Sequence, residues 1–217
     1  MSVITADSGD GFIVGEDDFG DYSTAHATTS YSDDASADMQ IGQIDDGGGI
    51  ITVGRGVIPF TAALGAGATI TAVDLSITRE GGSPTATVDI MAVVCSGVTL
   101  PIGSHLDADF DAVLAGVHPV QVGRSSDWSN DATKTVAMTA GDFNPNGTTY
   151  VGLLSDDDRN SIAPGSGDDA TLLLYSSESA TAGFRPKVTV TYTLPGGVIK
   201  REEIMAGRMA EMNGGFR

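Results

Sequence analysis

The residues best suited to chemistry in this chain are the carboxylates that crowd two loops in its C-terminal third. Carboxylate and amide oxygens at short spacing are the hard ligands that Ca²⁺ prefers. Their spacing differs from that of an EF-hand, and acidic loops are commonly solvated without a bound metal, so both interpretations stay open. The candidate calcium ligands are Asp156, Asp157, Asp158, Asn160, Asp168 and Asp169.

Other patterns for catalysis are weak. The three histidines, His26, His105 and His118, are far apart and form no His-x-x-x-His pair, which argues against zinc. The single cysteine, Cys95, follows the strand-like run 88–94, so we expect a small buried side chain and not a reactive thiol. Aspartate pairs are so frequent that no particular pair indicates a glycosidase. We therefore expect a protein without enzymatic activity.

Three aromatic side chains offer a different kind of site. Aromatic rings stack on the faces of pyranose sugars, so Trp128, Tyr150 and Tyr175 could together form a glycan-binding platform. Tyr150 and Tyr175 also fall within strand patterns, where the simpler interpretation is that they pack inside the protein or at its edges. Glycan binding is therefore the alternative hypothesis.

The charge of the chain limits its partners. The formal net charge is −18 at pH 7, so we expect neither nucleic acid nor anionic lipid as a partner. Residues 1–54 hold eleven acidic residues and no basic one, and Arg55 is the first. Because Arg55 stands within an apolar strand pattern, we expect it to be the buried partner of a carboxylate. Arg185 could pair with the acidic loop at 156–158.

The segments that must position these residues have the alternation and turn spacing of β-structure. Strand patterns occur at 39–44, 50–60, 69–77, 85–95, 133–138, 147–155, 172–175 and 187–192. We count about eight to ten strands, a number typical of a sandwich. Residues 107–115 predict one short helix with aspartates near its start.

Both ends of the chain differ from this body. Residues 1–38 are rich in Asp, Ser, Thr and Gly, and we interpret them as an arm, disordered or ordered on a neighbouring subunit. Residues 196–217 carry four basic and three acidic residues, a net charge of +1. Within them, Lys200 to Met212 predicts a helix that is marginal alone in water, so its face needs the body or a partner. The predicted partner-binding residues are Ile204, Met205, Arg208, Met209 and Met212.

No signal peptide is visible at the start, and no stretch approaches 18 apolar residues, so we expect no membrane-spanning helix. The composition is nevertheless that of a surface-exposed β protein. A virion protein, made in the host cytoplasm and exposed after lysis, fits both facts.

Three segments carry a family resemblance. Residues 55–77 contain an arginine, a strand, a phenylalanine and a run similar to Ile-Thr-x-Ala-x-Leu; residues 147–159 read Gly-Thr, strand, acidic loop; residues 175–192 read Tyr-Ser-Ser-Glu and then Arg-Pro before a closing strand. These blocks resemble the DNRLRE-type β-sandwich modules, jelly-roll domains of bacterial surface proteins, some carbohydrate-binding modules and phage virion proteins. Thr61 stands where that family often has Asp. The resemblance covers most of 40–193 and implies a fold, not an activity.

These observations predict an all-β protein: a jelly-roll β-sandwich at 39–195, an extended N-terminal arm at 1–38 and a short C-terminal helical tail at 196–217. The predicted function is that of a non-enzymatic phage virion structural protein, a capsid decoration or another head- or tail-attached protein. We expect it to self-associate, by analogy as a trimer, and to bind other virion proteins. The alternative is a carbohydrate-binding module of a phage fibre or a bacterial surface protein.

Overall fold

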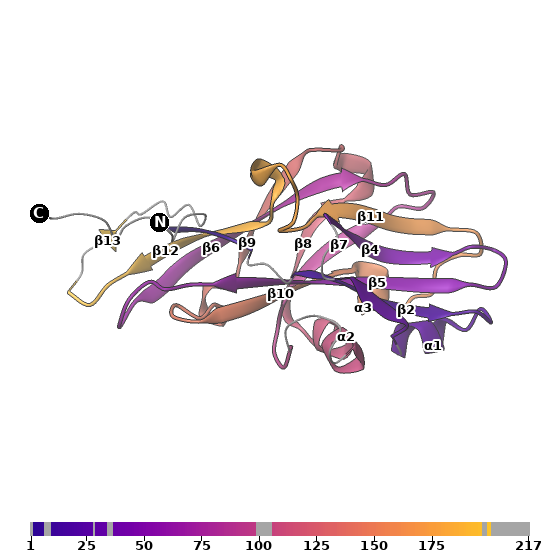
Figure 1. The fold of residues 1–217 in the computed structure, drawn as a ribbon, viewed down its shortest axis with the longest axis horizontal. Helices are drawn as coiled ribbons and strands as arrows, with labels where there is room; N and C mark the ends of the chain where they lie inside the picture. Colours follow the sequence, from indigo (N-terminus) through magenta and orange to yellow (C-terminus); the bar gives the residue numbers. More distant parts are fainter. Residues whose placement is uncertain are drawn as a thin grey trace, which may run out of the picture.

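The computed structural model describes residues 2–6, 10–27, 29–33, 37–98, 106–196 and 199–200. Those residues form one large, curled antiparallel sheet of thirteen strands, with a few short helices (Figure 1). The prediction of a mostly β protein is therefore confirmed.

Eight of the thirteen strands coincide with the strand patterns of the sequence, and the other five do not. The strands are β1 (Ser2–Thr5), β2 (Gly11–Asp17), β3 (Tyr31–Asp33), β4 (Asp38–Asp45), β5 (Ile51–Thr61), β6 (Thr69–Gly81), β7 (Asp89–Cys95), β8 (Val117–Arg124), β9 (Thr133–Met138), β10 (Thr148–Ser155), β11 (Asp169–Tyr175), β12 (Lys187–Thr193) and β13 (Ile199–Lys200). The α-helices are α1 (Tyr22–Ala27), α2 (Leu106–Leu114) and α3 (Asp156–Arg159), and three 3₁₀ turns are η1 (Ser125–Asp127), η2 (Ala140–Asp142) and η3 (Ala182–Phe184). The helix expected at 107–115 is thus confirmed as α2.

The strands are connected through long central elements. The main path runs β1-β12-β6-β11-β4-β5-β10-β7-β8, with β9 paired to β6, β2 to β5, β3 to β2 and β13 to β12. The 13-residue β6 pairs with β12 and β9 along most of its length and with β11 at its end. Strand β6 therefore links β12 and β9 to β11 within the curled sheet.

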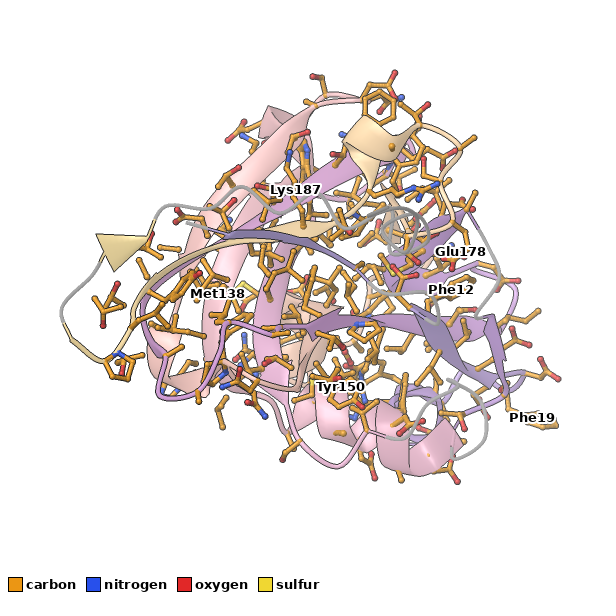
Figure 2. All side chains as sticks on the ribbon, turned by 60° about the vertical axis from the view of Figure 1, so that its left-hand side comes forward. Phe12, Phe19, Met138, Tyr150, Glu178 and Lys187 are labelled. Carbon is orange, nitrogen blue, oxygen red and sulfur yellow. The ribbon has the colours of Figure 1, made fainter. Side chains whose placement is uncertain are left out.

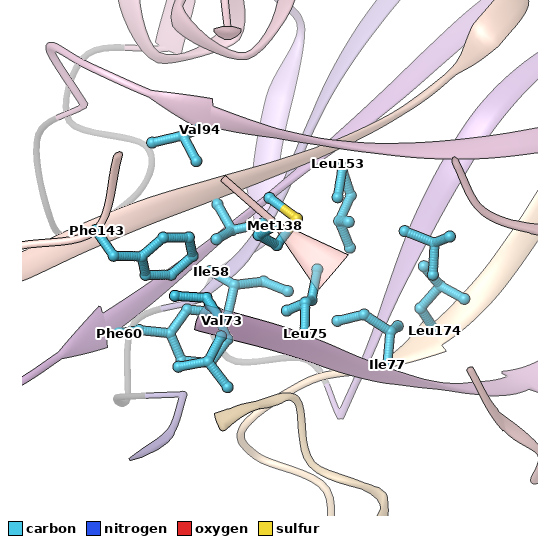
Figure 3. Packing of buried hydrophobic residues seen from close by; sticks show 14 of the residues in the cluster. Ile58, Phe60, Val73, Leu75, Ile77, Val94, Met138, Phe143, Leu153 and Leu174 are labelled. Atoms are coloured by element: carbon cyan, nitrogen blue, oxygen red, sulfur yellow. The ribbon is translucent and has the colours of Figure 1, made fainter. Parts of the chain in front are cut away.

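The larger apolar core forms where β5, β6, β9 and β10 face one another (Figure 3). Alternation along β5 places Ile58 and Phe60 in this core, while Val57, next to Ile58, belongs to a separate apolar cluster. Trp128, from the loop before β9, is also buried in it. Burial of these side chains is the main favourable term for the fold.

A second apolar core lies on the other face of β5, beneath α1 and α2 (Figure 1). It takes Val53 and Val57 from β5, Ile13 from β2, and Phe110 and Val113 from α2. Because β5 is covered on both faces, it reads as a nearly continuous buried run and not as an alternating strand.

The N-terminal segment differs from the extended arm that we predict at 1–38. Strand β1 pairs with β12 and β2 pairs with β5, and Ile13 and Val14 are almost completely buried. Apolar side chains in this segment outweigh the polar composition around them, because Ile13 packs in the second core and Phe12 packs against the larger one.

Only the first residue of the predicted C-terminal helix falls within the described residues. Lys200, expected to begin a helix, lies in β13, which pairs with the end of β12. The rest of the predicted helix, 201–212, lies outside the described residues. Among the described residues, no helix has the length and apolar character needed to cross a bilayer.

Candidate functional site

Arg55 lies at a junction of the sheet. On one edge of β5, β2 pairs with residues 51–57; on the other edge, β4 pairs with 51–54 and β10 with 56–61. The glycines on either side of Arg55 permit this exchange of partners. A Cβ on Gly54 would collide with the carbonyl oxygen of Gln40, and one on Gly56 would lie 2.8 Å from the Ile41 Cδ1.

The Arg55 guanidinium has a partner on every side. Its Nε and Nη2 donate to the two carboxylate oxygens of Asp158, at 2.7 and 2.8 Å. Nη1 donates to the carbonyl of Phe110 at 3.0 Å, and Nη2 also to that of His26 at 3.2 Å. The Phe110 ring covers one face, with its centroid 3.6 Å from Cζ. Both charged side chains are 0% exposed. This is the bidentate, stacked geometry that arginine forms and lysine does not.

Asp158 is held by the short helix α3. The Ser155 hydroxyl accepts from the Asp158 N–H at 3.1 Å and caps the helix. Serine is a preferred N-cap, and carboxylates in a first turn interact favourably with the helix dipole. The Ser-Asp-Asp-Asp sequence therefore explains locally why the chain turns here and presents Asp158 to Arg55.

Polar side chains from β4 and α1 complete the network. The His26 Nε2 lies 3.1 Å from the Asp158 carbonyl oxygen and 3.4 Å from its Oδ1. The Gln43 side-chain amide lies 3.0 Å from the Tyr22 hydroxyl. When the amide is rotated by half a turn, its oxygen accepts from the Asp158 N–H and its nitrogen donates to the Ile162 carbonyl. Burial, and then the negative charge of Asp158, raises the pKa of the Tyr22 phenol well above its usual value.

This network joins three helices to the central strand of the sheet. Neither Arg55 nor Asp158 is open to solvent, so in this conformation the pair acts as a clamp and does not present a charge to a ligand. The prediction that Arg55 is a buried partner of a carboxylate is confirmed. Arg185 does not reach the 156–158 loop; its Nε donates to the Ser179 carbonyl at 2.8 Å.

The predicted calcium ligands are spread over two loops with different roles. Asp158 is fully engaged by Arg55, which removes it as a ligand. Asp169 accepts from the N–H and hydroxyl of Thr171, and the Asn160 amide donates to the Asp156 carbonyl. The pKa of Asp157 is raised by burial and by the charges of Asp156 and Asp89. Within the described ranges, no three carboxylate, imidazole or thiol groups converge as metal ligands would.

The predicted glycan-binding aromatics do not share a surface. Trp128 is 1% exposed, and its Nε1 donates to the Ala132 carbonyl, so its ring faces are not open to a sugar. Tyr150 packs against the second core. Tyr175 stacks on Phe184, with ring centroids 4.8 Å apart.

The predicted partner-binding residues of the tail, Ile204, Met205, Arg208, Met209 and Met212, lie outside the described residues. Cys95 is buried as expected, and burial raises the pKa of its thiol to about 12.

Asp10 is a second buried carboxyl group that the sequence did not indicate. It is 0% exposed, and its two oxygens accept from the N–H and the hydroxyl of Ser177 at 2.8 and 2.5 Å. Burial, followed by a hydrogen bond to Glu178, raises the pKa of Asp10 from 3.8 to about 8. For Glu178, burial alone would raise the pKa, but hydrogen bonds from Asp10, Ser177 and Ser176 lower it. At neutral pH the two groups therefore share one proton, held mainly by Asp10.

Comparison with protein-family models found no match, and a search of curated proteins found no relative with significant similarity. The resemblance to DNRLRE-type modules thus rests on the quoted residues alone and stays an expectation.

Proposed function

We propose that this chain is a non-enzymatic structural protein of a phage particle, in which a jelly-roll β-sandwich body is displayed as a capsid decoration or at another head or tail position. The observation that carries the proposal is the arrangement of the chain ends. Strands β1 and β13 both pair with β12, β1 at residues 187–190 and β13 at residues 192–193.

This arrangement suits attachment at one end. The N-terminal end of the chain and strand β13 lie toward the same end of the elongated body, and the turns that join β2 to α1 and β4 to β5 lie at the other (Figure 1). A body fixed through its termini would present those turns outward. The two apolar cores give it the rigidity that a displayed domain needs.

Charge supports the same proposal. Residues 196–217 carry a net charge of +1, so the rest of the chain carries −18 minus 1, or −19. A charge of this size keeps a body soluble and repels identical bodies, while a segment of the opposite sign is suited to a contact. We expect self-association through the tail, by analogy as a trimer, together with binding to other virion proteins.

Immunogold electron microscopy tests this function. Antibodies raised against the folded body should label intact particles purified from a lysate, at one structural position. The proposal fails if the protein is abundant in the soluble lysate but purified particles carry neither label nor the protein.

A second candidate is a carbohydrate-binding module, favoured by one observation. Tyr175 and Phe184, both half-buried, stack at 4.8 Å, and the Tyr175 hydroxyl donates to Asp131 at 2.9 Å. An aromatic surface beside a carboxylate is suited to a sugar ring and its hydroxyls. Glycan-array binding that is lost in Tyr175→Ala and kept in Tyr150→Phe would support this candidate, and equal binding by both variants would contradict it.

A further inference from the structure

Three loops meet at the end of the body far from β13. They comprise residues 17–21, 45–50 and 161–168, and we call them together the loop end. A Cβ on Gly20 would lie 3.8 Å from the Gly49 Cα, and one on Gly47 would lie 3.5 Å from the Gly167 Cα. The Asp45 N–H also donates to the Asp168 carbonyl at 2.9 Å. The loops are therefore in contact with one another.

The loop end combines exposed apolar side chains with negative charge. Four large apolar side chains are strongly exposed among the described residues, and three of them are in these loops: Phe19 at 93%, Ile162 at 52% and Ile50 at 39%. The same loops hold six aspartates and no lysine or arginine. Figure 2 shows Phe19 projecting at the edge of the molecule, clear of other labelled side chains.

The turn that carries Phe19 is held in place by its own hydrogen bonds. Asp17 accepts from the N–H groups of Phe19 and Asp21, at 3.0 and 2.7 Å. Asp21 in turn accepts from the N–H and hydroxyl of Ser23, at the start of α1. An aromatic ring presented by a constrained turn loses little conformational entropy on binding, which is the property of an interface anchor.

The best-matched occupant within this chain is the tail. Residues 201–217, which follow β13, contain Ile204, Met205, Met209 and Met212 and carry three arginines and three glutamates. Methionine-rich segments adapt to irregular apolar surfaces, and the arginines of this segment are suited to pair with the aspartates of the loop end. The tail leaves the body through β13, at the end away from the loop end (Figure 1).

We propose that the loop end of one copy binds residues 201–217 of a second copy, with Phe19 as its apolar anchor. Such a contact joins two different surfaces, so it links copies head to tail, into a ring where the rotation closes and into a row where it does not. This inference rests on the proposed function, because it takes the tail to be the assembly element.

Sedimentation velocity of the full chain tests the proposal. The wild type should form species larger than the monomer, and Phe19→Ser should weaken the association about ten-fold or more, as loss of an interface anchor does. The matched control is Val117→Ser, since Val117 is 49% exposed but lies on β8, outside the loop end. Added salt should also weaken the association.

A synthetic peptide of residues 201–217 identifies the occupant. In excess, it should dissociate the wild-type assembly, and it should bind the wild type more tightly than Phe19→Ser in a fluorescence anisotropy titration. If the full chain stays monomeric up to about 100 µM and does not bind the peptide, the proposal is wrong, since the contact would be far weaker than a typical specific interface. An assembly that Phe19→Ser weakens but the peptide leaves intact also overturns it, because two loop ends would then contact each other. The immunogold result is independent of both outcomes, so the two proposals can fail separately.

Discussion

Arg55 and Asp158, 103 positions apart in the chain, form a fully buried ion pair with two hydrogen bonds between their side chains. The pair ties the central strand β5 to the acidic turn that follows β10. A buried charge is tolerated only while its partner and its remaining hydrogen bonds are in place. The pair thus penalises any arrangement in which α3 or the β4–β10 junction is displaced.

Replacement of Arg55 should be strongly destabilising. Arg55→Met leaves Asp158 buried without its counterion, and we expect the free energy of unfolding to fall by about 3–5 kcal/mol. Urea denaturation measures this. The double variant with Asp158→Asn should lose less than the sum of the two single losses, because both changes remove the same interaction.

Arg124→Met is the matched control for that experiment. Arg124 and Asp89 are also paired, at 2.6 Å, but the Arg124 side chain is 50% exposed. Exposed pairs contribute little, so stability should be almost unchanged. Equal losses in Arg55→Met and Arg124→Met would contradict the role assigned to burial.

Gly54→Ala should destabilise the junction on which Arg55 depends. The added methyl group would collide with the Gln40 carbonyl oxygen of β4, a backbone atom that cannot rotate away. We expect a lower melting temperature and loss of the Arg55 environment. Gly183→Ala is the control, since a Cβ added there would meet no atom within 4 Å, and it should melt like the wild type.

The strand positions and the burial of Arg55 could be predicted from the sequence because both depend on local pattern. Alternation in β12 and the apolar run of β5 identify strands without knowledge of their neighbours. A lone arginine in such a run must find a carboxylate. Which carboxylate could not be predicted, because Asp156, Asp157 and Asp158 are alike in sequence and only the orientation of α3 distinguishes them.

The folded N-terminal segment and the Asp10 site could not be predicted for a related reason. The partners of β1 and β2 lie in β12 and β5, and those contacts are set by tertiary packing. Likewise, Asp10 and Ser177 are 167 positions apart, and neither is surrounded by a recognisable motif. Trp128 differs in the opposite direction. A tryptophan at this position suggested part of an exposed sugar-binding surface, but its indole is buried in the larger core.

Stability should depend on pH through Asp10. Its pKa is 3.8 when unperturbed and about 8 in the folded protein, so between these values the folded state binds more protons than the unfolded state. Stability from this group is therefore fully present below about pH 4 and is lost as the pH rises toward 8, by at most about 1.4 kcal/mol per pH unit. Denaturation at a series of pH values, at constant ionic strength, measures the slope.

Asp10→Asn should remove that slope. The amide can still donate to Glu178 and accept from Ser177, but it does not ionise. Relative to the wild type, we expect similar stability below about pH 4 and greater stability at pH 9. A variant that keeps the wild-type slope between pH 5 and 8 would show that another group is responsible.

Cys95 should be unreactive in the native protein. It is 7% exposed, and burial raises the pKa of its thiol to about 12, so almost no thiolate exists at pH 8. We expect no reaction with a disulfide reagent in buffer over minutes and one reactive thiol per chain in guanidinium chloride. Fast labelling of the folded protein would mean that β7 opens locally.

Divalent cations should stabilise the protein, because a net charge of −18 destabilises its compact state. The expected result is a higher melting temperature in millimolar calcium than in chelator, at matched ionic strength. The variant that tests a site is Asp156→Asn with Asp157→Asn, since a change at Asp158 would also break the pair with Arg55. Asp111→Asn with Asp127→Asn removes the same charge from exposed positions outside the loop end. A calcium effect lost only in the first variant indicates a bound ion at the start of α3, and one kept in both variants indicates screening. An unchanged melting temperature in the wild type would contradict the prediction.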